Sequence, residues 1–181
     1  MVERSATFNV AEVLHWMGHD EGEALRLATR ARVLYERFID RPLPYASILL
    51  ARIHILRGDL EEARALVAQV AQTCPPPEQD PAEVFYRMLL LVLSAAGRAP
   101  PITSGLALHW DGVIKSASNG IFIEEMVEVL YWRAWTAVQT ERWAEALATL
   151  ESAQHYLKER PMWLPRFTEL WAKAREAKPR L

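Results

Sequence analysis

Three arginines lie singly in apolar segments, where a charged side chain is costly to bury without a partner. Arg52, Arg87 and Arg133 are separated by 35 and 46 residues. Guanidinium groups bind carboxylates and phosphates through paired hydrogen bonds and stack on aromatic rings, and the last arginine is flanked by Tyr131, Trp132 and Trp135. This set predicts a surface that binds a carboxylate, a phosphate or an acidic peptide. The alternative is structural, with each arginine paired to a glutamate on a neighbouring helix or extended to water.

A second arginine set lies on one side of the segment 20–39 and consists of Arg26, Arg30 and Arg37. Three phosphate contacts of this kind would give salt-dependent binding of nucleic acid. Glu23 belongs to the same stripe, however, and the net charge of the chain is −2. The pattern therefore favours the solvated side of an outer helix and argues against nucleic acid as a partner.

Other polar and aromatic patterns have structural interpretations. His15 and His19 have a spacing at which two histidines can share a metal ion, but Gly18 is expected to end the helix between them, and we predict no metal site. Trp163, Phe167 and Trp171 repeat every four residues, which favours an aromatic face that covers the end of the fold. The alternative for that face is the docking of another domain or subunit.

The sequence favours a protein that is not an enzyme and has no cofactor. The motifs GxSxG, GxGxxG and the phosphate-binding P-loop are absent. Cys74 precedes three prolines, with no histidine near it in the sequence to activate its thiol. Glu124, Glu125 and Glu128 could serve as acid–base carboxylates, but the first turn of a helix, where the helix dipole stabilises acidic side chains, explains them more simply.

Composition predicts a helical globular chain. Of its 181 residues, 51% are apolar and 24% are charged, which excludes a disordered protein. Its 26 alanines and 23 leucines, beside only 7 glycines, favour helices over a turn-rich β fold. The longest apolar run is about nine residues, whereas a membrane span needs about 20. The single cysteine and the lack of a secretion signal pattern predict a cytoplasmic location.

Turn and capping residues divide the chain into nine expected helices. Aspartates three residues before glutamates, at positions 20, 59 and 80, have the spacing of the capping box. Gly18, Gly58 and Gly97 follow apolar stretches as helix-terminating glycines do. The helices are expected at about 5–17, 20–39, 44–57, 59–73, 80–97, 103–118, 121–139, 142–160 and 165–178. Those at 44–57, 80–97 and 121–139 are apolar nearly all round, which predicts burial on two sides.

Three segments repeat a pattern of small residues. With Ala24, Ala63 and Ala146 as anchors, small or aliphatic residues recur four and seven positions later. The anchors are separated by 39 and 83 residues, and the second spacing is about two repeat units. Self-similarity at this period is typical of stacked helical hairpins.

The residues of this repeat are similar to a known family. The segment from Gly58 to Ala63, Gly-Asp-Leu-Glu-Glu-Ala, resembles the turn and second-helix start of a tetratricopeptide (TPR) repeat, and the segment from Arg142 to Leu147 is similar. Pro75 stands where a TPR often has its closing proline. The period of about 40 exceeds the TPR period of about 34, and the chain is most similar to the longer TPR-like repeats in the sensor regions of MalT-type bacterial transcription regulators. This resemblance covers about residues 5–160.

The resemblance implies a fold and a function. We expect one all-α domain, a right-handed superhelix of about four TPR-like hairpins at 5–39, 44–73, 80–118 and 121–160, with a capping helix at 165–178. The first helices, which carry Arg52, Arg87 and Arg133, would line a concave groove that binds a peptide or a partner domain. The expected function is therefore a non-catalytic protein–protein interaction module, as part of a bacterial regulator or as its partner. The alternative is a sensor of a small-molecule effector, and nucleic-acid binding is less favoured.

Overall fold

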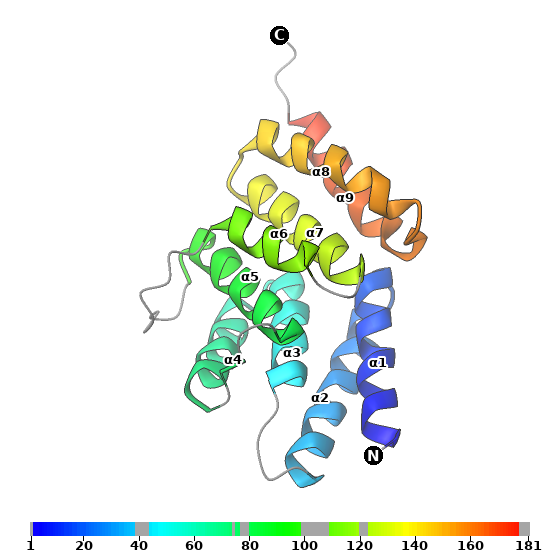
Figure 1. Cartoon of the computed structure of the whole chain (residues 1–181), viewed down its shortest axis with the longest axis vertical. Coiled ribbons are helices and arrows are strands. Elements are labelled where there is room, and N and C mark those ends of the chain that lie inside the picture. Colours follow the sequence, from blue (N-terminus) through cyan, green and yellow to red (C-terminus); the bar gives the residue numbers. More distant parts are fainter. Residues whose placement is uncertain are drawn as a thin grey trace.

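The helices expected from the sequence are present in the computed structural model, which describes residues 2–38, 44–73, 75–76, 80–98, 109–119 and 123–177. These residues form only helices and their connections, which confirms the all-α prediction (Figure 1). The α-helices are α1 Val2–Met17, α2 Glu21–Phe38, α3 Pro44–Arg57, α4 Leu60–Thr73, α5 Pro81–Ala95, α6 Trp110–Ser118, α7 Ile123–Gln139, α8 Trp143–Leu157 and α9 Leu164–Glu176. A short 3₁₀ helix, η1 (Pro161–Trp163), precedes α9.

Two of the three predicted aspartate caps are formed, at positions 20 and 80, whereas the Asp59 carboxylate contacts His54 and Arg57. The Asp20 carboxylate accepts a hydrogen bond from the Glu23 backbone N–H at 3.0 Å, and the Asp80 carboxylate accepts one from the Ala82 N–H at 2.8 Å. Gly58, between α3 and α4, has a φ of 86°, a left-handed conformation that glycine adopts without steric cost. Of the expected helices, residues 39, 103–108, 121–122 and 178 lie outside the described residues, and so does Cys74.

Consecutive helices pack in pairs. α1 packs on α2, α3 on α4, α5 on α6, and α7 on α8. Neighbouring pairs are joined by contacts of α2 with α3, of α3 with α5, and of α5 and α6 with α7. The last helix, α9, packs on α8 and α7 and also on α1, so the first and last helices of the described chain are in contact (Figure 1).

The core contains the small residues that the repeat pattern singles out. The anchors Ala24, Ala63 and Ala146 are fully buried, and so are the residues one turn later, Ala28, Val67 and Leu150. The helices expected to be apolar all round, α3, α5 and α7, bury residues on most of their circumference. No helix in the described ranges has both the length and the apolarity needed to cross a bilayer.

A small side chain at an anchor position is required by close packing. We expect Ala63→Leu to lower the free energy of unfolding by about 1–3 kcal/mol, because the added atoms have no free space in a packed core. Ala65→Leu on the exposed side of α4 is the matched control, since both substitutions have similar helix propensity. Urea unfolding followed by circular dichroism measures the difference, and equal stability of the two variants would contradict this account of the packing.

Candidate functional site

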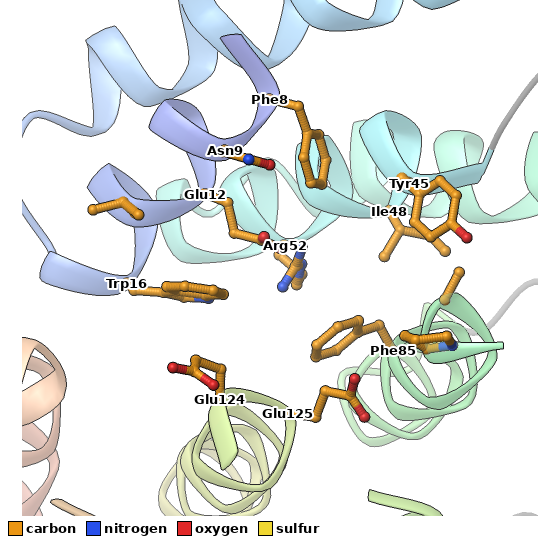
Figure 2. A pocket seen from close by; sticks show the side chains of 13 residues that line it. Phe8, Asn9, Glu12, Trp16, Tyr45, Ile48, Arg52, Phe85, Glu124 and Glu125 are labelled. Carbon is orange, nitrogen blue, oxygen red and sulfur yellow. Dashed lines mark hydrogen bonds and ion pairs between the residues drawn. The ribbon is translucent and has the colours of Figure 1, made fainter. Parts of the chain in front are cut away.

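A pocket of about 530 Å³ lies between α1, α3, α5 and α7 (Figure 2). Its volume is in the range of small-molecule binding sites. Four aromatic side chains contribute to its wall: Phe8 and Trp16 from α1, Tyr45 from α3 and Phe85 from α5. Three glutamates and one arginine add charge to this apolar lining: Glu12, Glu124, Glu125 and Arg52.

The polar atoms of the aromatic wall already have partners. Trp16 donates its indole N–H to Glu128 at 2.9 Å, and Tyr45 donates its hydroxyl to the Asp80 carboxylate at 2.9 Å. Burial, together with the hydrogen bond to Asp80, raises the pKa of Tyr45 to about 12, so its hydroxyl keeps its proton at neutral pH. The ring faces, rather than hydrogen-bonding groups, are therefore what these residues offer to a ligand.

Arg52 links the pocket to a buried charge network. Only 1% of its surface is exposed, and its Nη1 lies 2.5 Å from Glu128 Oε2. Its Nη2 donates to Glu12 Oε1 at 2.9 Å, and its guanidinium carbon lies 4.5 Å from the centre of the Phe85 ring. The positive charge is thus held by two carboxylates and an aromatic face.

Glu128 is the centre of this network. It is fully buried on α7 and also accepts hydrogen bonds from the indole N–H groups of Trp16 and Trp132, while His15 Nε2 lies 3.6 Å from its Oε1. Burial alone would raise its pKa, but the charge of Arg52 and the contact with His15 outweigh burial and lower the pKa to about 2. Glu128 therefore stays ionised and joins α1, α3 and α7.

His15 and Arg166 extend the network to the last helix. Burial lowers the pKa of His15 below 6.5, so the imidazole is neutral at pH 7. Arg166 of α9 donates through Nε to the backbone carbonyl of His15 at 2.6 Å and also pairs with Glu21. His19 is exposed and lies beyond the end of α1, and no three His, Cys, Asp or Glu side chains in the described residues are grouped to hold a metal ion.

The glutamates of the pocket wall differ in their partners. Glu12 pairs with Arg52, and Glu124 accepts a hydrogen bond from Arg160 Nε at 2.5 Å. Glu125 is only 4% exposed, and it has no hydrogen bond or ion pair within the described residues. Burial raises its pKa above 4.5, and the negative charges of Glu124, Asp80 and Glu12 raise it further.

The structure does not bring the three candidate arginines into one site. Arg52 lines the pocket. Arg87 Nη1 instead lies 3.7 Å from Glu83 Oε1, and Arg133 Nε lies 3.4 Å from Glu145 Oε1. Arg52 and Arg133 thus contact glutamates on neighbouring helices, as the structural alternative describes, whereas Glu83 lies on the same helix as Arg87. The binding role of these residues in a groove stays a prediction.

The candidate aromatic residues near Arg133 belong mainly to the core. Tyr131 and Trp132 are buried, and Trp135 is half-buried against Trp132. Tyr131 also packs on the rings of Trp163 and Phe167, both of them fully buried. Trp163 and Phe167 therefore cover the end of the fold, which is the structural role that the sequence favours over docking of another domain.

Sequence reasoning missed the pairing of Arg52 with Glu128. Glu128 lies in a nearly all-apolar helix, and the same criterion that selects Arg52 and Arg133 would also have selected it. The sequence pattern instead predicts it in an acidic first helical turn. Glu12, Phe8 and Trp16 carry no comparable signal, because their role depends on contacts between distant hairpins.

Comparisons with protein-family models, with curated proteins and with solved structures find no match to this chain.

The buried network is expected to be essential for stability. Glu128→Gln should lower the free energy of unfolding by about 3 kcal/mol or more, because it leaves the buried charge of Arg52 without its main partner. Glu169→Gln, which removes an exposed ion pair with Lys173 on α9, should cost less than about 0.5 kcal/mol. Chemical unfolding at pH 7 measures both, and equal effects would contradict the role of Glu128.

The contribution of Glu128 should also depend on pH. Its pKa in the folded chain is about 2, below the ordinary value of 4.5, so the unfolded chain takes up the proton first as the pH falls. The stabilisation is therefore present above about pH 4.5 and is lost as the pH falls towards 2. The stability gap between the unsubstituted chain and Glu128→Gln should shrink by about 2 kcal/mol between pH 7 and pH 3. A gap independent of pH in parallel unfolding titrations would show that Glu128 is not ionised.

Proposed function

We propose that the chain is a non-catalytic binding module and that the pocket between α1, α3, α5 and α7 holds a small-molecule effector. The observation that carries this proposal is the pocket itself, with its volume of about 530 Å³ and its wall of aromatic side chains. Concave, mainly apolar sites with a few placed polar groups are typical of small-ligand binding. A regulatory role as a sensor follows from the resemblance to the repeats of MalT-type regulators.

The position of the pocket supports a repeat architecture. In the proposed TPR-like superhelix, α1, α3, α5 and α7 are the first helices of four successive hairpins, and all four contribute to the pocket wall. First helices line the concave side in the family that the sequence resembles. The contact of α9 with α1 would close this side around the pocket rather than leave a long open groove.

The second candidate function is the binding of a peptide or partner domain. Two valines on α1 favour it: Val13, which lines the pocket and is 39% exposed, and Val10, which is 51% exposed. A partner segment could cover these apolar side chains and place one of its own side chains in the pocket. The small effector is preferred because the charged candidates for a peptide groove, Arg52 among them, already contact carboxylates of the chain.

A neutral fluorescent dye tests the pocket directly. N-phenylnaphthylamine, whose emission rises in apolar surroundings, should bind the purified chain saturably at one site. Asn9→Trp should weaken this binding at least about tenfold, because Asn9 lines the pocket and its exposed position lets an indole project into the space without altering the core.

Val10→Trp is the matched control. It places the same indole on the next residue of α1, which is exposed and does not line the pocket, and dye binding should be unchanged. Absence of saturable binding, or equal weakening by the two substitutions, would refute a ligand site in this pocket. A peptide partner captured by both the unsubstituted chain and Asn9→Trp would favour a surface outside the pocket.

A further inference from the structure

Glu125 is the unusual group of the pocket. Only 4% of the residue is exposed, and no hydrogen bond or ion pair within the described residues involves its carboxylate. Figure 2 shows it on the α7 side of the pocket, opposite the α1 side chains and below Phe85. Its carboxylate oxygens are not among the fully enclosed polar atoms that lack a partner, so they keep some contact with the cavity that the residue lines, where a bound cation could pair with them.

The charges around the pocket are predominantly negative. In the described part of the chain, the carboxylates of Glu12, Asp80, Glu124, Glu125 and Glu128 act on this region together with the guanidinium groups of Arg52 and Arg160. Arg52 is already paired with Glu12 and Glu128, and Arg160 with Glu124. His15 adds no positive charge at pH 7, because its burial lowers its pKa. The pocket therefore favours a positive ligand and disfavours a negative one.

The aromatic wall suits an organic cation better than a metal ion. Phe8, Trp16, Tyr45 and Phe85 present ring faces, which attract cations through their quadrupole and also bury apolar groups. Arg52 above Phe85 already shows a cation held in this way. The pocket carboxylates are also not grouped as metal ligands in the described residues.

We infer that the pocket binds an organic ammonium ion whose charged head pairs with Glu125 while its apolar part packs among Phe8, Trp16 and Phe85. This inference rests on the proposed function, of which it names the ligand class. Burial and the repulsion from Glu124, Asp80 and Glu12 raise the pKa of Glu125, and an ammonium head group would offset that repulsion and favour the ionised carboxylate.

Three probes of similar size and different charge test the inference: phenethylammonium, phenylethyl alcohol and phenylacetate. Each is titrated at pH 7.5 against the chain loaded with N-phenylnaphthylamine, and displacement of the dye is measured. We expect phenethylammonium to bind about tenfold more tightly than the alcohol, and phenylacetate to bind most weakly. Glu125→Gln should keep the dye affinity but remove the preference for the cation over the alcohol.

Glu151→Gln is the matched control, because Glu151 lies on the exposed side of α8, away from the pocket, and this variant should keep the preference. If the dye binds in the pocket but the three probes bind equally, or the cation does not displace it, the inference fails and the proposed function stands. If the dye does not bind, both fail. If Glu125→Gln does not fold, the ranking of the probes on the unsubstituted chain decides alone.

Discussion

Arg52 and Glu128 meet in the interior of the molecule, where neither charge is stable without the other. Moving an ion out of water costs several kcal/mol, and the attraction of a buried pair offsets this only when the remaining hydrogen-bonding positions are also filled. Glu128 meets this condition, since two indole N–H groups and the guanidinium donate to it and His15 lies beside it. Apolar packing alone tolerates small shifts between helices, but this network requires α1, α3 and α7 in one arrangement.

The rest of the fold follows from that arrangement. Glu128 of α7 contacts Trp16 and His15 of α1, so the first and last hairpins are held together. α9 then packs across both, and Arg166 fixes it to the carbonyl end of α1. With α3 and α5 on the remaining sides, the helices enclose a pocket rather than a flat surface. The pocket is thus a consequence of the same charges that stabilise the interior.

Local sequence signals predicted the helices well, but they could not predict which residues far apart in the chain pair with each other. Capping residues, helix-ending glycines and the alanine pattern act within one or two helical turns, so they can be recognised from the sequence alone. The anchor alanines predicted from that pattern are indeed buried. The partner of Arg52 lies 76 residues away, and although the apolar neighbours of Glu128 mark it as a candidate buried charge, nothing local shows that Arg52 is its partner. Likewise, the pocket wall combines side chains from four helices, and no single segment carries its pattern.

Glu125 and Glu128 lie close together on one helix but in opposite electrostatic environments. Both are buried on α7, three positions apart, so they point to adjacent parts of the same face. Glu128 faces Arg52 and two indoles, and its pKa falls to about 2, whereas Glu125 faces other carboxylates and a cavity, and its pKa rises. The first carboxylate is stabilised by the chain itself. No basic group within the described residues pairs with the second carboxylate, and in our proposal a bound cation does so, which places the ligand in the pocket rather than at the arginines.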